Sequence, residues 1–471
     1  MTGNQLRPTI GIRRAEVNGA LVDVLCGDGT ITDVSPSPAR STGADIELDA
    51  DGGALLPGLH DHHIHLLALA AARASLSAAP PTVTTPSAFD QLLRSASGED
   101  WLRVVGYHEF HAGPLDRDRL DTLIPARPVR VQHASGAMWV LNSAAFDITG
   151  LEHSHGEGIE RDERGRATGR LYGLDDILRE RIPPTPLDLP SVGRELAGYG
   201  VTGVTDLTPT TDPGQLELLA RHVAAPNFPL DVTITGALDL PANVAADLRR
   251  GPVKIIVADH ALPDIGTLAR AINRAHHIER NVAVHCASRI ALILAVAAWE
   301  EASVVPGDRI EHGAVVPLEL IPHLAELGLT VVTQPSFVVD RGDRYLHEVP
   351  PEEHADLWRC GSLISAGVAV AAGTDAPFGD PDPWRAIAAA HERRTASGRD
   401  LGPAERLEPN RALAMFRTSP HDPAGATRLV AVGEPARLCL LDRPLRQVLC
   451  QPTSAAVRAT ITRDDVTERP V

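Results

Sequence analysis

The sequence predicts an α/β protein built on a distorted (β/α)8 barrel of the TIM type. Apolar stretches rich in Val, Ile and Leu alternate with segments of helix length, which is the pattern of a parallel sheet with crossover helices. Short strands with Asn-Gly and Asp-Gly turns occupy the N-terminal stretch, and strands of the same kind return near the C-terminus. We therefore expect a barrel, a small β-sandwich domain formed from both termini, and a large insertion after the first barrel strand.

The limits of these parts follow from where the pattern changes. Residues 1–53 and 426–471 should form the sandwich, and residues 54–425 should form the barrel. Within the barrel, residues 67–198 should form a cap-like insertion, because Pro-rich stretches interrupt this long interval and such insertions usually cover a barrel's active site. The expected barrel strands are residues 54–66, 201–207, 230–238, 253–259, 282–286, 309–316, 329–334 and 368–375.

Composition excludes several classes of partner. The 471-residue chain has a formal net charge of −17, which opposes binding to nucleic acid or to an anionic membrane. It has no apolar run of about 18 residues that would span a bilayer, and its first residues lack the apolar core of a secretory signal, which predicts a cytoplasmic protein. We expect a small-molecule substrate, and we leave open whether the chain forms a homo-oligomer.

Histidines and one aspartate stand at the ends of the expected barrel strands. His63 and His65 are two residues apart, so both point to the same side of a strand. His285, His312 and Asp375 each end a later strand. Because the carboxyl ends of barrel strands converge on one site, we expect these side chains to form a metal centre.

Lys254 is the only lysine in a chain with 44 basic residues, and it lies within the fourth expected barrel strand. Burial lowers the pKa of a lysine and can leave its amine neutral, whereas an arginine stays protonated. This lysine is therefore a candidate for chemistry that a guanidinium cannot perform.

The stretch "LLPGLHDHHIHL" resembles the Pro-Gly-x-x-Asp-x-His-x-His signature of the amidohydrolase superfamily. Other stretches, among them "RIEHGAVV", "TQPSF" and "GTDAPFGDPDPW", are similar to the amidohydrolase-3 group, which includes N-substituted formamide deformylases and YtcJ-like metal-dependent hydrolases. The resemblance covers nearly the whole chain. It implies a metal-dependent hydrolase of a C–N bond, in an amide, formamide or cyclic amide, with a metal-bound hydroxide as the nucleophile.

The resemblance also implies roles for the residues at the strand ends. The metal ligands would be His63, His65, Lys254, His285, His312 and Asp375. Two divalent ions would be bound, with carboxylated Lys254 as the bridge between them. Carbon dioxide adds only to a neutral amine, and the carbamate that forms would be an anionic oxygen ligand suited to lie between two metal ions. Zinc is the expected metal, and Mn, Fe, Co and Ni are alternatives because such ligands accept each of them. Asp375 would also be the catalytic proton shuttle.

The sequence leaves two possible roles open for His133 and for Lys254. His133 in the insertion would bind substrate or would cap a turn. Asp61 would orient a ligand imidazole from behind the metal site. Lys254 could instead be a structural residue paired with a buried acid such as Asp259. His60 and His62 are expected to point to the other face of their strand.

Two other functions remain open. A site with one metal on the same barrel would suit deamination of a heterocycle, and Lys254 would then be only a neighbour of the metal. A non-catalytic binding or scaffold protein is the third hypothesis, although such chains usually lose the metal-ligating residues.

The insertion has no cluster of basic residues, so we expect a neutral or modestly polar small organic substrate.

Overall fold

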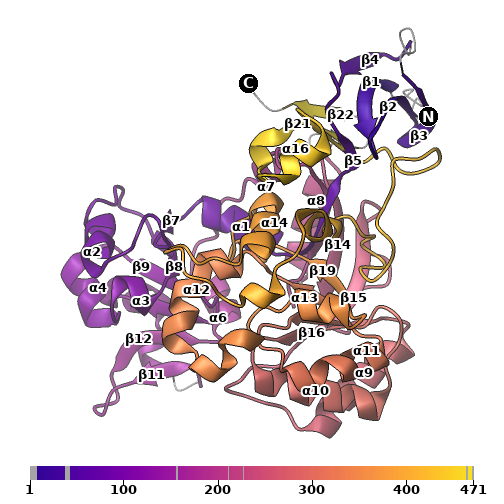
Figure 1. The fold of residues 1–471 in the computed structure, drawn as a ribbon. Helices are drawn as coiled ribbons and strands as arrows, with labels where there is room; N and C mark the ends of the chain where they lie inside the picture. The colour runs from indigo at the N-terminus through magenta and orange to yellow at the C-terminus, as the bar shows by residue number, and fades with distance from the viewer. Residues whose placement is uncertain are drawn as a thin grey trace. The chain divides into compact units, whose positions relative to one another are not determined.

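Eight parallel strands form the largest sheet of the structure, a computed structural model that describes residues 8–37, 43–154, 157–209, 212–225, 228–462 and 465–468 (Figure 1). Every neighbouring pair in the sheet is parallel. The strands are β6 (Leu59–Ile64), β13 (Val201–Asp206), β14 (Asp231–Gly236), β15 (Leu248–Ile256), β16 (Val282–Cys286), β17 (Arg309–His312), β18 (Thr330–Thr333) and β19 (Ala369–Ala372). They correspond to the predicted barrel strands, and the predicted fold class is confirmed.

Two backbone hydrogen bonds join the chain after the last barrel strand to the first strand. The amide of Asp375 donates to the carbonyl of His63 at 2.7 Å, and the amide of His65 donates to the carbonyl of Ala376 at 2.9 Å. The sheet therefore closes where the predicted metal ligands lie.

Helices pack on the barrel strands with their apolar faces. Asp264 caps α9 (Ile265–His277) and Ser288 caps α10 (Arg289–Ala302), each by accepting a backbone N–H of the first turn. The buried faces of both helices join one core with β15, β16 and β17. The other α-helices outside residues 67–188 are α7 (Leu189–Ala197), α8 (Pro213–Val223), α11 (Ile321–Leu327), α12 (Phe337–Glu348), α13 (Gly361–Ser365), α14 (Pro383–Glu392), α15 (Pro409–Ala414) and α16 (Leu445–Leu449).

Two four-stranded sheets form the β-sandwich from both ends of the chain. One has the order β3 (Thr30–Pro36), β2 (Ala20–Gly27), β1 (Ile10–Val17), β4 (Ile46–Asp49). The other has the order β22 (Asp465–Glu468), β21 (Val457–Thr462), β20 (Leu438–Leu441), β5 (Leu55–Pro57). Alternating residues of both sheets share one core, including Ile10, Ile12, Leu438 and Leu440.

Residues Leu67–Asp188 form a separate compact unit, and Met1–Leu66 with Leu189–Val471 form the other. The smaller unit has a sheet in the order β11 (Ile159–Arg161), β12 (Ala167–Tyr172), β10 (Met138–Leu141), β9 (Val129–His133), β8 (Leu102–Tyr107), β7 (Leu76–Ser77). Its α-helices are α1 (Leu66–Arg73), which belongs to it from Leu67 on, α2 (Pro86–Arg94), α3 (Glu109–Ala112), α4 (Arg117–Leu123), α5 (Ser143–Thr149) and α6 (Asp175–Arg181). Its own apolar clusters support it.

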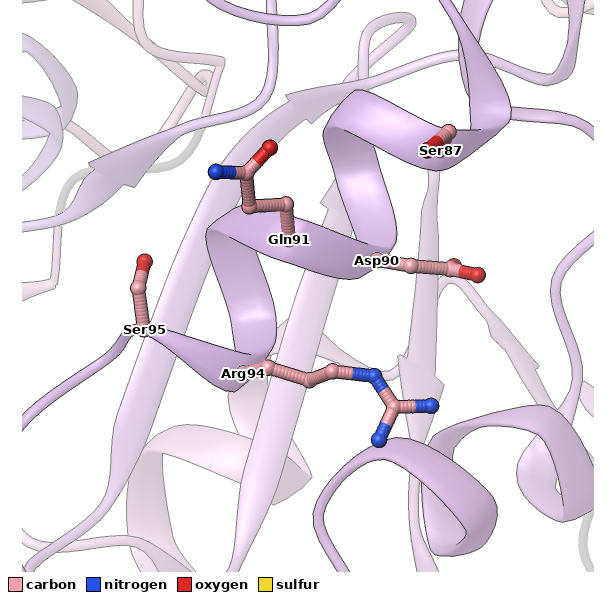
Figure 2. Close-up of a pocket in the computed structure, with 5 residues that line it drawn as sticks. All are labelled: Ser87, Asp90, Gln91, Arg94 and Ser95. Carbon is pink, nitrogen blue, oxygen red and sulfur yellow. The ribbon is translucent and has the colours of Figure 1, made fainter.

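Helix α2 shows how this smaller unit separates apolar from polar side chains. Phe89 and Leu93 are buried in the core. Side chains on its outer surface line a pocket, and Figure 2 labels them as Ser87, Asp90, Gln91, Arg94 and Ser95. In the part of the chain that is described, no helix has both the length and the apolar character needed to cross a membrane.

Candidate metal centre

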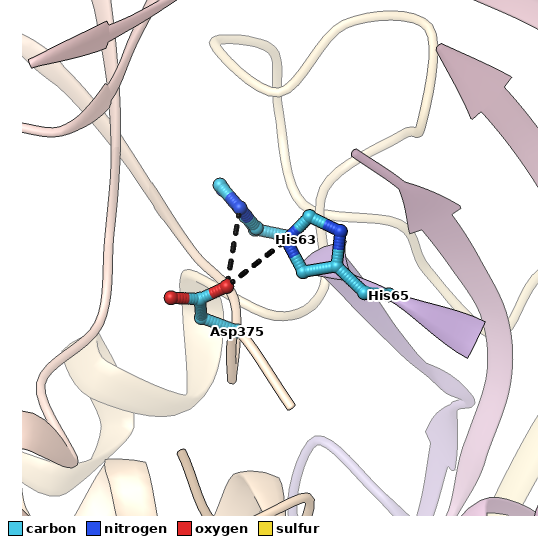
Figure 3. Close-up of side chains that lie close together, drawn as sticks. All are labelled: His63, His65 and Asp375. Carbon is cyan, nitrogen blue, oxygen red and sulfur yellow. Dashed lines mark ion pairs between the residues drawn. The ribbon is translucent and has the colours of Figure 1, made fainter. Parts of the chain in front are cut away.

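Three of the predicted ligands meet where the barrel closes (Figure 3). Oδ1 of Asp375 lies 3.4 Å from Nε2 of His63 and 3.2 Å from Nε2 of His65. One donor atom from each residue falls within 4.8 Å of the others, a spacing that could hold a metal ion. His63 and His65 come from β6 and the residue after it, whereas Asp375 follows β19.

The other two predicted histidines join the same cluster. Nε2 of His312 lies 2.9 Å from Nδ1 of His285, so the two nitrogens are close enough to bind one ion. The rings of His312 and His63 have centroids 4.7 Å apart. The four histidines and Asp375 therefore lie together at the carboxyl ends of β6, β16, β17 and β19.

The side chain of Lys254 is buried among these residues. The residue is 7% exposed, and its Nζ has no hydrogen-bond partner among the described residues. Burial lowers the pKa of the amine to about 8, although Glu311 and Asp375 favour its charged form. Asp259 is exposed and accepts the hydroxyl of Ser288, and Lys254 Nζ forms no hydrogen bond with it, so the alternative in which the lysine pairs with Asp259 is wrong.

The ionisation states of the cluster suit metal ligands. Burial lowers the pKa of His285 to about 3, and it also lowers the pKa values of His63 and His312. These imidazoles are therefore neutral at neutral pH, the form that binds a metal. Burial alone would raise the pKa of the Asp375 carboxyl, but His63 and His65 outweigh it and the pKa falls below its usual value. Neutral imidazoles, an ionised carboxylate and an unpartnered buried amine fit a divalent metal centre.

Glu311 and Gln334, which the sequence did not point to, form hydrogen bonds that fix the rings of His63 and His312. Nδ1 of His63 donates to Oε2 of Glu311 at 2.6 Å, and Nδ1 of His312 donates to Oε1 of Gln334 at 2.7 Å. These bonds place the proton on Nδ1 and leave the Nε2 lone pair available for a metal. Glu311 is fully buried and is paired with Arg309 at 2.6 Å.

Asp61 acts on the backbone and not on a ring, so the prediction that it orients a ligand imidazole is wrong. Its carboxylate accepts the backbone N–H of His63 at 3.1 Å and that of Thr374 at 3.0 Å. It also accepts the hydroxyl of Thr374 at 2.5 Å. The carboxylate that binds a ligand ring is Glu311 on β17, whose Oε2 accepts the Nδ1–H of His63 at 2.6 Å.

His60 and His62 lie away from the cluster, as the strand alternation predicts. Their Nε2 atoms lie 2.9 Å from the hydroxyl of Thr205 and 2.8 Å from that of Thr418, respectively.

Two members of the cluster have an unusual backbone: φ is 71° at His312 and 55° at Asp375. Non-glycine residues rarely adopt this left-handed conformation, and such strain tends to be kept at functional sites.

His133, the predicted substrate-binding residue, lies in the smaller unit at the end of β9. Its Nε2 lies 2.9 Å from Oε2 of Glu109, and its ring centroid is 4.7 Å from that of His108. Nδ1 of His133 accepts the backbone N–H of Ser135 at 3.1 Å, which closes a turn. The substrate-binding role remains a prediction.

Replacing Glu311 with Gln should weaken metal binding by about 10–100-fold, because His63 loses the charged partner that orients it. It should also reduce the free energy of unfolding by about 3–5 kcal/mol, since Arg309 is left buried without an opposite charge. Metal titration and thermal unfolding of the variant measure the two effects.

Glu405→Gln is the matched control, because Glu405 is another buried carboxylate, bound to Arg359 at 2.7 Å. This variant should lose a similar amount of stability and keep its metal affinity. Equal metal affinity in both variants and the original protein would show that Glu311 does not serve the centre.

The chain is similar to known proteins in sequence and in fold. A family model described as the amidohydrolase family matches residues 47–466. The N-substituted formamide deformylase of Arthrobacter pascens is 25% identical over 482 residues, covering 88% of each chain. The putative amidohydrolase YtcJ of Bacillus subtilis (strain 168) is 25% identical over 398 residues, covering 74% of this chain and 75% of the relative. The crystal structure of an uncharacterized metal-dependent hydrolase from Pyrococcus horikoshii OT3 shares the fold, with a TM-score of 0.72 at 18% identity, covering 92% of this chain and 97% of the other.

Proposed function

The chain belongs to the amidohydrolase family, and from this premise we propose that it hydrolyses a C–N bond of a small organic substrate with the help of bound divalent metal ions. The bond is that of an amide, a formamide or a cyclic amide. The N-substituted formamide deformylase that it resembles supports this class of substrate.

One observation carries the proposal: the six predicted residues lie together in the barrel, where the buried imidazoles of His63, His285 and His312 are neutral and the carboxylate of Asp375 is ionised at neutral pH. Two divalent ions would be held by His63, His65, Lys254, His285, His312 and Asp375. Bound there, such ions polarise a carbonyl group and lower the pKa of a coordinated water molecule. Glu311 and Gln334 keep the imidazole lone pairs directed into the centre.

Asp375 is the residue that moves the proton. Its carboxylate is buried among His63 and His65 and is ionised at neutral pH. It accepts a proton from the attacking water as the carbonyl carbon becomes tetrahedral. It then donates this proton to the leaving nitrogen as the C–N bond breaks, so one residue serves as base and then as acid.

Lys254 would supply an anionic oxygen ligand to the metal ions after reaction with carbon dioxide. The lone pair of the neutral amine attacks the carbon of CO2, an N–C bond forms, one C–O π bond opens, and a proton leaves to solvent. The product is a carbamate with two oxygen donors, which removes the cost of an unpartnered amine at 7% exposure.

Metal removal tests the proposal. The purified chain should contain about two divalent ions and should release amine from members of a panel of formamides, amides and lactams. Chelation should abolish this activity, and metal should restore it fully only when bicarbonate is also supplied. Hydrolysis that survives complete chelation would refute the metal-dependent mechanism, and one ion per chain with heterocycle deamination would favour the single-metal alternative.

A further inference from the structure

Arg341 is a cation beside the metal centre. It lies in α12, its guanidinium stands 3.7 Å from the centroid of the Phe337 ring, and its Nη2 donates to the carbonyl of Phe378 at 2.5 Å. No described carboxylate forms an ion pair with it. Asp340, the residue before it, is already paired with Arg385 at 2.9 Å.

The buried arginines among the described residues are satisfied by other groups of the protein. The chain has 61 acidic residues against 44 basic ones, and its most buried arginines have carboxylates beside them or backbone carbonyls around them. Arg309 is paired with Glu311 at 2.6 Å, and Arg359 with Glu405 at 2.7 Å. A guanidinium has five N–H donors, and the carbonyl of Phe378 takes one donor of Arg341.

Arg341 is connected to Asp375 through the backbone of Phe378. Phe378, whose carbonyl it binds, donates its own amide to the carbonyl of Asp375 at 2.8 Å. The Phe378 ring meets the His65 ring edge-on, with centroids 5.5 Å apart. Although burial raises the pKa of Asp375, the charge of Arg341 is among those that lower it. The guanidinium therefore stands at the edge of the metal centre.

We propose that Arg341 binds a carboxylate group of the substrate, so that the preferred substrates are amides or formamides that carry an anionic group. The inference rests on the proposed function, and it replaces the expectation of a neutral substrate. Arginine suits this role because its planar fork matches a carboxylate with two parallel hydrogen bonds. The stacked Phe337 ring and the Phe378 carbonyl hold the fork in place and reduce the entropy lost on binding.

Binding of compounds that cannot be hydrolysed tests the inference apart from catalysis. The probes are methyl ketones with a terminal carboxylate on chains of two to five carbon atoms, each compared with its neutral alcohol by calorimetry on the metal-loaded protein. For at least one chain length, we expect the carboxylate to bind about 10–100-fold more tightly than the alcohol. Arg341→Met should abolish this preference and change alcohol binding by less than about twofold.

Two further variants separate recognition from support of the fold. Arg341→Lys keeps the charge but not the fork, so it should retain only part of the preference. Arg344→Met removes a neighbouring arginine that is paired with Glu348 at 3.6 Å, and it should leave the preference unchanged.

The outcomes are distinguishable. The inference is overturned if no chain length shows a preference, or if Arg341→Met weakens both members of a pair equally. If the preference depends on Arg341 but no amide of the same series is hydrolysed, the proposed function fails while the binding role stands.

Discussion

Replacing Lys254 with arginine should reduce kcat/KM by about 10³-fold or more and lower the metal content from about two ions per chain to at most one. Arginine keeps the positive charge but cannot form a carbamate, so the oxygen ligand that we propose for Lys254 would be lost. The loss in rate corresponds to several kcal/mol of transition-state stabilisation, the amount that a metal Lewis acid supplies. Elemental analysis and steady-state kinetics measure the two effects.

Ile255→Val is the matched control, because Ile255 is the next residue of β15 and is half-buried against the helical core. It should cost about 0.5–1.5 kcal/mol of stability and leave metal content and kcat intact. If Lys254→Arg retained two ions and full activity, the bridging role of Lys254 would be refuted.

Replacing Asp375 with Asn should lower kcat by about 10²–10⁴-fold, the usual contribution of a general acid–base residue. The amide has the shape of the carboxylate but can neither accept nor return the proton. Asparagine also tolerates the left-handed backbone at this position, where φ is 55°. The fold should therefore persist, as circular dichroism and thermal unfolding would show.

Asp380→Asn tests whether any lost charge in the same loop has this effect, because Asp380 lies 3.8 Å from Arg385 and takes no part in the cluster. Its kcat should stay within about twofold of the original. A small change in kcat for Asp375→Asn, with metal still bound, would mean that another group moves the proton.

Much of the fold could be predicted because the barrel strands are apolar runs. The stretch 54–66 was predicted as one strand, but the structure divides it between two sheets, with β5 in the sandwich and β6 in the barrel. Gly58 lies between them, and a Cβ there would stand 2.1 Å from the Thr202 side chain. Apolar character predicts a strand, whereas the choice of sheet depends on a close contact with a residue far along the chain.

The predicted histidines, lysine and aspartate do lie together, but the residues that support them could not be found by the same reasoning. Strand alternation would place Glu311 and His312 on opposite faces, yet both approach His63. The extended backbone ends at His312, where φ is 71°, so alternation does not hold there. Gln334 has no recognisable spacing, and only the three-dimensional structure reveals its bond to His312.

The hydrogen bonds between Asp61 and Thr374 have a consequence for how the chain holds itself together. These residues are 313 positions apart, and their bonds tie the first barrel strand to the segment after the last. In the chain-entropy model, fixing the ends of so long a loop costs about 6 kcal/mol. Metal ions shared by His63, His65 and Asp375 would act at this same junction as a non-covalent cross-link. Bound ions would therefore stabilise the closed barrel by linking its first strand to the segment that follows its last strand.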